Sequence, residues 1–365
     1  MTDDESHMRA ALSLARRGLG QTAPNPSVGC VIVKDGLVVG RGNTAPGGRP
    51  HGEIMALQAA GEAARGATAY VTLEPCNFAG KSGACTEALI AAGIARVVVG
   101  ATDPHPKVNG AGLARLREAG IKVTEGVMRH ECEAVAEGFI LVQRHGRPLI
   151  RLKLATTLDG KIATGKGESQ WITGPEARRA SHAMRGRHDA VLVGVGTVLA
   201  DDPELTCRLD GFRAAKLVRV VVDSHLRTPF LSKLVRDAAE HPLWILHRNG
   251  ADPLRRKALE GVGVKLIELP ACPAGVDLSA GVKALAKHGL TRVLVEGGGT
   301  IAAGMLRARL VDRLSWFHAP AVMGGDGWPA AQAFGISKLE EMPRFRAVSR
   351  QQWGEDVLTN FRKIG

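Results

Sequence analysis

The sequence contains few aromatic residues and no long apolar run. Phenylalanine, tryptophan and tyrosine make up 4% of the 365 residues, and there is a single tyrosine. No apolar segment approaches the roughly 18 residues that a membrane-spanning helix needs. The start, MTDDESHMRAALSLARRGLG, is acidic and then amphipathic, without the basic and apolar regions of a secretory signal. We therefore expect a cytoplasmic protein that has no membrane as a partner.

Cysteine is also scarce, with six residues in the whole chain. So few cysteines in so long a chain do not form the disulfide framework of a small secreted protein. In a reducing compartment, paired cysteines indicate metal binding or catalysis. A disulfide between Cys76 and Cys85 is the less favoured alternative.

Basic charge is concentrated in the second part of the chain. Residues 1–145 carry 15 Lys or Arg and 14 Asp or Glu, whereas the remaining residues carry 33 and 22. Such an excess favours an anionic partner. Nucleic-acid surfaces usually combine clustered basic residues with aromatic ones, whereas here the basic residues are scattered and aromatics are few. Small phosphorylated ligands, or an ordinary solvated surface, fit better.

The chain length predicts two domains, which we place at 1–146 and 147–365. In the first, strand-like and helix-like runs alternate, and an Asp35-Gly36 turn joins two strands, so that an α/β sandwich is expected. Gly146-Arg147-Pro148 follows a helical run and marks the boundary. The second domain restarts with apolar strand-like runs, which are typical of a sheet covered on both faces.

A histidine, a glutamate and two cysteines occur in the order expected of a zinc site. His51 and Glu53 begin a helix-like run, Cys76 follows a strand-like run, and Cys85 begins a second helical run. One histidine and two thiolates leave the fourth tetrahedral position of Zn²⁺ to a water, as in catalytic sites. Glu53 would then carry a proton from that water to a leaving amine. A surface histidine with two core thiols is the alternative.

With APNPSVGCVIV upstream and ATDPHPKVNGAG downstream, these residues resemble the deaminase half of the bifunctional riboflavin-biosynthesis deaminase–reductases. Eight residues separate the two cysteines, a longer spacer than deaminases of nucleic acid or free cytidine usually have. The resemblance implies zinc-dependent hydrolytic deamination of a diaminopyrimidine that carries a ribosylamino 5′-phosphate. It also implies substrate contacts from four residues that equally suit turns or solvated loops: Asn25, Lys81, Asp103 and Asn109.

The chain departs from this family at several positions near the site, and one of them is Gly83-Ala84, where members often have two prolines before the second cysteine. Gly52 stands where the family usually has alanine, and Thr44 and Phe78 stand where members often carry histidine. The predicted zinc ligands and general base are retained. The departures therefore concern the hydrogen bonds that bind the substrate and not the residues that carry out deamination.

The second part of the chain lacks the G-x-G-x-x-G fingerprint of Rossmann domains, because Leu199 stands where the third glycine would be. It has glycine turns at strand ends instead, in GVGTVLA and VEGGGT. At Gly297–Gly299, backbone N–H groups and a helix start could bind an anion that approaches the backbone closely. A tight structural turn is the alternative.

The segments LKLATTLDGKIA, SQWITG, AVLVGVGTVLADDPELTCR and VEGGGT resemble the reductase half of the same family, whose fold is similar to dihydrofolate reductase. The resemblance implies NADPH-dependent reduction of the ribosyl group to a ribityl chain, with Lys153 and Asp201 as candidates for proton delivery. It implies cofactor contacts from Ala155, Trp171, Thr197, Asp201, Ser224, Gly298, Gly299, Thr300, Ile301, Ala302, Ala303 and Gly304. It implies substrate contacts from Ser169, Arg185, Leu205, Arg208 and Glu296.

The two resemblances together cover nearly the whole chain. They predict a bifunctional enzyme with an N-terminal cytidine-deaminase-like α/β/α sandwich and a C-terminal dihydrofolate-reductase-like α/β domain. They also imply a homo-oligomer, either dimer or tetramer, that binds small phosphorylated pyrimidines and no nucleic acid. One alternative is a tRNA-type zinc deaminase with a basic C-terminal binding module, since TLEPC also resembles those enzymes. Another is a structural zinc protein, which leaves Glu53 without a use.

Overall fold

The computed structural model describes residues 2–78, 83–209, 217–273 and 275–364. The chain divides into two compact units, Met1–Arg147 and Pro148–Gly365, called the first and second units below. The last helix of the first unit ends at Gly146, whose φ of +64° and N–H bond to the Val142 carbonyl form a left-handed helix cap. Glycine adopts this conformation without strain, so the chain leaves the helix there.

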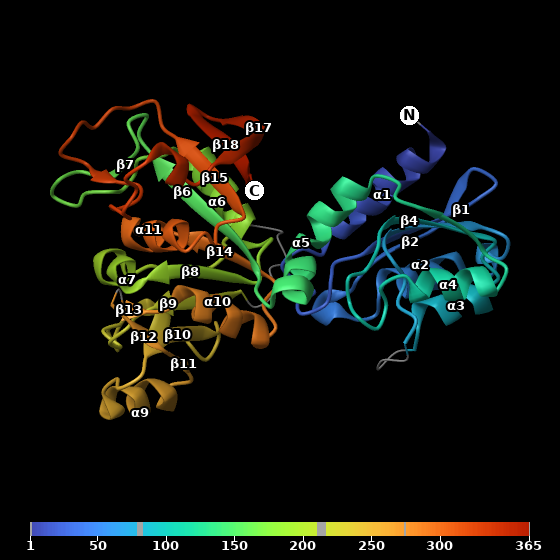
Figure 1. The fold of residues 1–365 in the computed structure, drawn as a ribbon, viewed down its shortest axis with the longest axis horizontal. Helices are drawn as coiled ribbons and strands as arrows, with labels where there is room; N and C mark the ends of the chain where they lie inside the picture. The colour runs from blue at the N-terminus through green and yellow to red at the C-terminus, as the bar shows by residue number, and fades with distance from the viewer. Residues whose placement is uncertain (1, 79–82, 210–216, 274, 365) are drawn as a thin grey trace. The chain divides into compact units, whose positions relative to one another are not determined.

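The first unit is a five-stranded sheet with helices on both faces (Figure 1). The strands follow the order β2 (Leu37–Asn43), β1 (Gly29–Lys34), β3 (Thr68–Leu73), β4 (Arg96–Ala101) and β5 (Lys122–Glu125). β1 is antiparallel to both neighbours, whereas β3, β4 and β5 are parallel. One face carries α1 (Asp3–Arg17) and α5 (Arg129–His145). The other carries α2 (Gly52–Ala60), α3 (Cys85–Ala91) and α4 (Ala111–Glu118).

This architecture confirms the predicted α/β/α sandwich. The hairpin between β1 and β2 turns at Asp35 and Gly36, whose φ angles of 50° and 77° are those of a two-residue turn. Residues Cys30–Ile32 and Val97–Val99 are at most 1% exposed, because β1 and β4 are covered on both faces. Cys30 is therefore a core thiol.

Two glycines of β2 allow α2 to pack directly on the strand backbone. A Cβ added at Gly40 would lie 2.3 Å from the carbonyl oxygen of Ala56. One added at Gly42 would lie 2.4 Å from the carbonyl oxygen of Gly52, the first residue of α2. The two glycines thus set the distance between the sheet and the start of this helix.

We expect Gly42→Ala to destabilise the first unit by about 1–3 kcal/mol, because the added methyl group forces α2 away from the sheet. Calorimetry would show a lower unfolding temperature for this unit. Gly261→Ala is the matched control, since a Cβ there meets nothing within 4 Å. An unchanged transition in Gly42→Ala would contradict the tight packing.

The second unit is built on a nine-stranded sheet. The order is β11 (Lys265–Leu269), β10 (Leu243–Arg248), β9 (Val218–Val222), β8 (Ala190–Gly194), β14 (Arg292–Glu296), β6 (Leu149–Thr156), β15 (Arg313–His318), β18 (Asp356–Lys363) and β17 (Phe345–Trp353). The strands from β11 to β15 are parallel, and β18 and β17 continue the sheet in antiparallel pairs. Two short ladders join β12 (Ala271–Cys272) with β13 (Gly275–Val276), and β16 (Trp328–Pro329) with β7 (Lys161–Ala163).

Alternate residues of these strands enter two separate apolar clusters. Leu192 belongs to one cluster, whereas Val191 and Val193 belong to the other. Since successive side chains of a strand point to opposite faces, both faces of the sheet are covered, as predicted. The helices are α6 (Pro175–Arg185), α7 (Val195–Asp201), α8 (Lys233–Arg236), α9 (Pro253–Gly261), α10 (Leu278–Lys287) and α11 (Gly299–Arg307).

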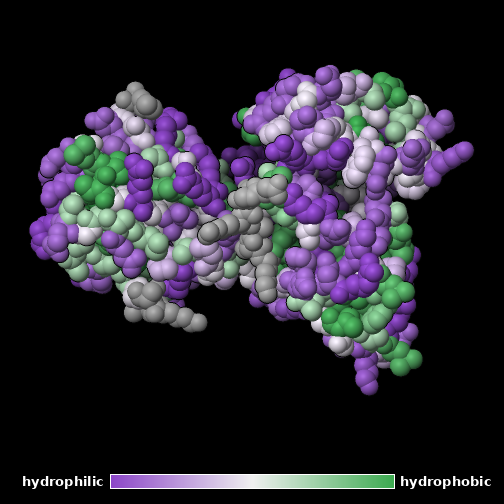
Figure 2. All heavy atoms as spheres, turned by 180° about the vertical axis from the view of Figure 1, so that it is seen from behind, coloured by the Kyte–Doolittle hydropathy of each residue, from purple (hydrophilic) through white to green (hydrophobic). Residues whose placement is uncertain are grey.

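Among the described residues, no helix is both long and apolar enough to span a membrane. Figure 2 shows mostly hydrophilic residues on the face it draws, with apolar residues in separate patches.

Candidate zinc and dinucleotide sites

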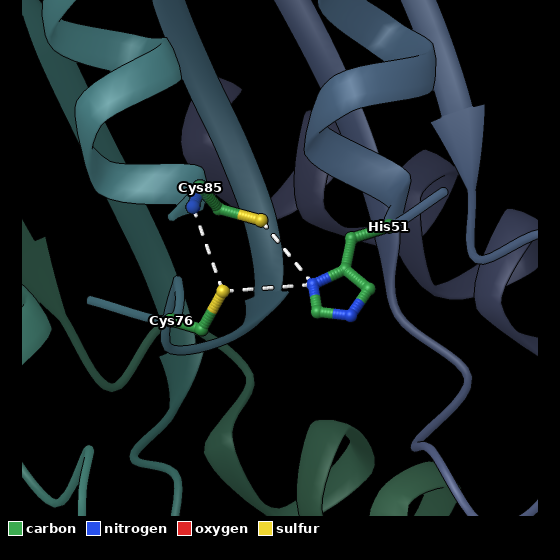
Figure 3. Close-up of side chains that lie close together, drawn as sticks. All are labelled: His51, Cys76 and Cys85. Atoms are coloured by element: carbon green, nitrogen blue, oxygen red, sulfur yellow. Dashed lines mark hydrogen bonds between the residues drawn. The ribbon is translucent and has the colours of Figure 1, made fainter. Parts of the chain in front are cut away.

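His51, Cys76 and Cys85 point toward one another in the first unit (Figure 3). His51 Nδ1 lies 3.3 Å from the Cys85 sulfur and 3.6 Å from the Cys76 sulfur. All three potential ligand atoms lie within 4.8 Å of one another. The sequence prediction that these three residues converge is confirmed by this geometry.

Three elements bring these side chains together. His51 caps the start of α2 with extended backbone angles, so it precedes the helix instead of forming its first turn. Cys76 lies in the loop after β3, and Cys85 is the first residue of α3. The Cys85 backbone N–H donates to the Cys76 sulfur over 3.5 Å, which holds the two segments in register.

The three residues fit a zinc ion. In a tetrahedral site with Zn–S of about 2.3 Å and Zn–N of about 2.0 Å, ligand atoms lie about 3.5 Å apart. The measured separations of 3.3 and 3.6 Å agree with this value. Three protein ligands also leave one tetrahedral position open, as a catalytic zinc site requires.

The two thiols shift each other's pKa in opposite directions. The hydrogen bond from the Cys85 thiol lowers the pKa of Cys76 to about 4, and the same contact raises the pKa of Cys85. The hydrogen bond with Cys76 likewise raises the pKa of His51. Because zinc ligands must be deprotonated, metal binding would release protons from this cluster.

Glu53 lies inside the first turn of α2 and is only 3% exposed. Burial raises the pKa of its carboxyl to about 7. Its Oε2 atom has no hydrogen-bond partner among the residues that the structure describes. A carboxyl that titrates near neutral pH suits proton transfer in both directions.

The predicted substrate residues of the first unit lie in different environments. Asn25 donates to the Gly48 carbonyl over 3.1 Å. Asp103 is buried, and burial raises the pKa of its carboxyl to about 6. Asn109 is exposed with a φ of +31°, and Lys81 lies outside the described residues.

Two loops near the zinc ligands contain side chains that the sequence did not single out together. The rings of Phe78 and His105 stack with centroids 5.6 Å apart, and Lys107 Nζ lies 6.0 Å from the Phe78 centroid. Thr44 accepts from the Val28 N–H over 2.9 Å and so is occupied by the backbone. The sequence signal that could have indicated this stacking is an aromatic ring shortly after Cys76 and a histidine in DPHPKVNG.

The glycine turns of the second unit meet at the carboxyl ends of β8 and β14. Connections from β8 lead outward to β9, β10 and β11, whereas β6 and β15 lie on the other side of β14. Ligands of parallel sheets bind where the chain direction changes in this way. Gly297 and Gly298 have φ of 77° and 79°, and a Cβ at Gly298 would lie 3.4 Å from Thr197 Oγ1. The two turns thus lie next to each other at this edge of the sheet.

Several predicted cofactor residues lie at the same edge of the sheet. Ala155 is near the carboxyl end of β6, Asp201 ends α7, and Ser224 follows β9. Residues Gly299–Gly304 form the first part of α11. Trp171 is 69% exposed, with the Arg178 guanidinium 4.5 Å from its ring centroid. These positions fit a dinucleotide whose phosphates approach the glycine backbone.

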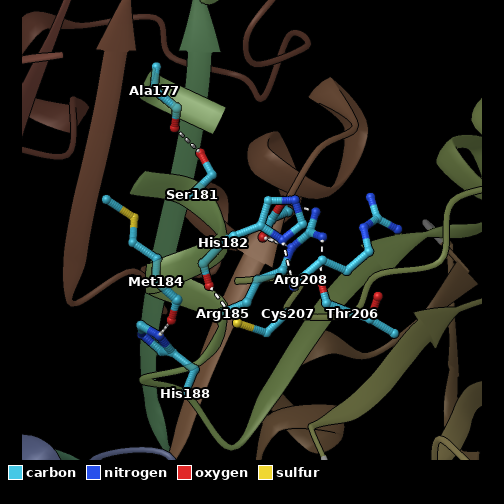
Figure 4. A network of polar contacts seen from close by, with 10 residues as sticks. Ala177, Ser181, His182, Met184, Arg185, His188, Thr206, Cys207 and Arg208 are labelled. Carbon is cyan, nitrogen blue, oxygen red and sulfur yellow. Dashed lines mark hydrogen bonds and ion pairs between the residues drawn. The ribbon is translucent and has the colours of Figure 1, made fainter. Parts of the chain in front are cut away.

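Arg185 and Glu296 form an ion pair, with Arg185 Nε and Nη2 2.8 and 2.9 Å from the two carboxylate oxygens. Arg185 also donates to the Thr206 carbonyl over 2.9 Å (Figure 4). Burial opposes ionisation of Glu296, but Arg185 overrides it and lowers the carboxyl pKa. Lys153, on β6, is the register partner of Glu296, and burial lowers its pKa.

The remaining predicted substrate residues are not held alike. Arg208 is exposed, and its guanidinium pairs with Glu204. The backbone N–H of Arg208 donates to His182 Nδ1 over 3.2 Å (Figure 4). Leu205 is 4% exposed and belongs to the apolar core. Ser169 is half-buried and lies in the segment of chain that connects β7 to α6.

Glu296→Gln should destabilise the second unit by roughly 3–5 kcal/mol, because it leaves the buried Arg185 without its counter-charge. The denaturation midpoint of this unit would report the loss. Glu268→Gln removes the exposed partner of Arg256 and is the control, with an expected loss of at most about 1 kcal/mol. Equal losses in the two variants would show that the Arg185 pair is no stronger than a surface pair.

Comparison with known proteins supports both assignments. The profile described as cytidine and deoxycytidylate deaminase zinc-binding region matches residues 1–101. The profile described as RibD C-terminal domain matches residues 148–359. The riboflavin biosynthesis protein RibD of Escherichia coli is 43% identical over 365 residues, which cover 97% of this chain and 98% of that protein. The chain belongs to the RibD family.

Solved RibD structures have the same fold. One form of Acinetobacter baumannii RibD superposes with a TM-score of 0.88 at 35% identity, covering 99% of each chain. The Thermotoga maritima diaminohydroxyphosphoribosylaminopyrimidine deaminase/5-amino-6-(5-phosphoribosylamino)uracil reductase gives a TM-score of 0.86 at 35% identity, again covering 99% of each.

RibD membership confirms the predicted fold class and the predicted bifunctional activity. The chain is a deaminase and reductase of riboflavin biosynthesis that uses zinc and NADPH. The tRNA-type alternative is not favoured, because both halves match RibD.

Proposed function

We propose that the first unit deaminates a diaminopyrimidine that carries a ribosylamino 5′-phosphate, and that the second unit reduces the ribosyl group of the product. The His51–Cys76–Cys85 cluster carries this proposal, together with the buried Glu53 carboxyl, whose Oε2 atom lacks a hydrogen-bond partner among the described residues. The name of the Thermotoga protein, which is similar over 99% of this chain, specifies the same two substrates.

In the deaminase unit, His51, Cys76 and Cys85 would hold Zn²⁺. When bound, Zn²⁺ is a Lewis acid that lowers the pKa of water. Glu53 takes a proton from the attacking water while the water oxygen bonds to the ring carbon that carries the amino group. Glu53 then gives this proton to the departing nitrogen, the C–N bond breaks, and ammonia leaves.

Four residues are proposed as substrate contacts of this unit. Asn25 and Asp103 are anchored by hydrogen bonds to or from the backbone, which suits recognition of a pyrimidine edge. Asn109 and Lys81 are proposed to complete the contacts, since the charge of a lysine suits a phosphate. The half-buried ring of Phe78 provides an apolar surface where relatives were expected to have a histidine.

In the reductase unit, NADPH supplies a hydride when bound. Thr197 and the Gly297–Gly299 turn would bind its phosphates through the backbone, with the remaining predicted cofactor residues along the same edge. Lys153 or Asp201 would deliver the proton that must accompany hydride addition at C1′ of the opened ribose, and the nitrogen bonded to C1′ would receive it. Lys153 fits this role because burial has lowered its pKa.

The proposed phosphate contact of this unit comes from Arg208, which is exposed and has a planar guanidinium suited to bidentate binding. Arg185 and Glu296 are proposed to contact the substrate as a pair, since each already orients the other. Ser169 and Leu205 complete the proposed set, the leucine through its backbone because its side chain is in the core.

We further propose that the domains are residues 1–146 and 147–365, and that the protein works in the cytoplasm as a homo-oligomer without nucleic acid. Six free cysteines, two of them poised to ligate a metal, are consistent with a reducing compartment. Sedimentation would test the assembly state, and salt-dependent RNA binding would argue against the exclusion of nucleic acid.

The test uses purified full-length protein loaded with zinc. Given the diaminopyrimidine ribosylamino phosphate, it should release ammonia with or without NADPH and oxidise NADPH only after deamination. Ammonia release without NADPH oxidation would refute the reductase half. Absence of ammonia, with release from a tRNA substrate instead, would refute the deaminase half.

A further inference from the structure

A buried carboxylate, Glu74, lies at the carboxyl end of β3, two residues before Cys76. It is 3% exposed. Its backbone N–H donates to the Ala101 carbonyl over 2.9 Å and so continues the pairing of β3 with β4. The side chain therefore starts from a fixed point of the sheet.

The carboxylate of Glu74 accepts hydrogen bonds from backbone N–H groups about thirty to forty residues away in sequence. Asp103 N donates to Oε2 over 3.2 Å, and Gly110 N lies 3.0 Å from both oxygens. Gly112 and Leu113 donate to Oε1 over 3.0 and 3.4 Å. One side chain thus holds both ends of the loop 103–110 and the start of α4.

Other hydrogen bonds of this loop are local. Val108 N donates to the His105 carbonyl over 2.8 Å, and His105 N donates to Asp103 Oδ1 over 2.7 Å. Such bonds shape the loop, but they do not fix its distance from the zinc ligands. The bonds of Glu74 do, because Glu74 and Cys76 belong to the same short segment.

The start of α4 packs closely on this segment. A Cβ added at Gly112 would lie 2.2 Å from the Pro75 carbonyl oxygen and 3.1 Å from Glu74 Oε1. Pro75 joins Glu74 to Cys76. The start of α4 therefore packs against the segment that carries both the Glu74 carboxylate and the predicted zinc ligand Cys76.

We infer that Glu74 is a positioning residue for deamination, which fixes the loop carrying Asp103 and Asn109 at a set distance from Cys76. This inference rests on the proposed function, which gives Asp103 and Asn109 a substrate contact. Glu74 itself does not touch the substrate. Its loss should therefore weaken substrate binding more than turnover, while the metal ligands stay in place.

The test is Glu74→Gln in the full-length zinc-loaded protein. The amide keeps the size of the side chain but turns an N–H₂ group toward backbone donors. We expect KM for ammonia release to rise about ten-fold, as for the loss of one well-placed hydrogen bond. The values of kcat, zinc content and NADPH oxidation on deaminated substrate should change little.

Asp4→Asn is the matched control within the same unit, because Asp4 pairs with Tyr70 and with Arg96, which begins β4 at the end opposite to the loop. It should lower the stability of the unit and leave KM unchanged. Ammonia release by the wild type is measured first, and its absence would refute the proposed function. If the wild type releases ammonia, the KM values of the variants test the role of Glu74 alone.

Two outcomes overturn the inference. One is a less stable Glu74→Gln protein with an unchanged KM, which would make Glu74 structural. The other is loss of zinc, which would make it a support of Cys76 and not of the loop. If Glu74→Gln does not fold, Gly112→Ala displaces the same junction without removing the carboxylate, and its KM decides in the same way.

Discussion

Glu53→Gln is expected to lower kcat for ammonia release by about 10³-fold, the scale of general acid–base catalysis. The amide cannot accept the proton of the attacking water, although it has the same shape as the acid. Zinc content should stay at one ion per chain, because His51, Cys76 and Cys85 are untouched. The measurement combines ammonia release with metal analysis of the same sample.

Glu62→Gln is the control for this prediction, since Glu62 is an exposed glutamate shortly after α2. It should deaminate at the wild-type rate. Normal turnover in Glu53→Gln would show that another group carries the proton. The loss of zinc together with activity would show that Glu53 acts on the metal site and not on the proton.

Cys85→Ser is expected to remove both zinc and deamination. A serine hydroxyl does not ionise near neutral pH, so the site would lose one of its three protein ligands together with a negative charge. Bound zinc should fall by about ten-fold or more, in line with the strength of a zinc–thiolate bond. Metal analysis after dialysis would report this fall.

NADPH oxidation on deaminated substrate should persist in Cys85→Ser, because the cofactor residues belong to the second compact unit. Cys272→Ser is the control, since Cys272 is half-buried in β12 of that unit. It should keep full zinc. A Cys85→Ser protein that retains zinc and deaminates normally would contradict the assigned ligand set.

The sequence predicted those features that depend on the type of a few residues and on their order along the chain. His51, Glu53, Cys76 and Cys85 were predicted because few other chemistries use those residues in that order. The β1–β2 hairpin was predicted because Asp35 and Gly36 tolerate the left-handed angles that the turn needs. Both signals are local or chemically specific.

Long-range hydrogen bonds were out of reach. Glu74 is the third residue of TLEPC, and nothing nearby in the sequence indicates that its partners lie near residues 103–113. Arg185 and Glu296 are 111 residues apart and were predicted as separate substrate contacts, although the structure pairs them. Such pairs depend on sheet order, which a single sequence does not contain.

Several helices of the second unit were not predicted, and for two of them the reason is local. α6 buries only Ala177 and Ala180, so PEARRASHAMR shows no wide apolar stripe. DAVLVGVGTV has the composition of a single strand-like run, whereas β8 ends at Gly194 and α7 begins at Val195. A short apolar run does not distinguish a buried strand from a helix start.

Isotope labels can show whether this one chain carries out both reactions on the same molecule. The protein receives the diaminopyrimidine substrate in water enriched in heavy oxygen, together with NADPH that carries deuterium at its transferable position. We expect a product with one heavy oxygen on the pyrimidine ring and one deuterium on the ribityl chain. A product that gains deuterium but keeps its amino group, or gains oxygen but no deuterium, would contradict this expectation.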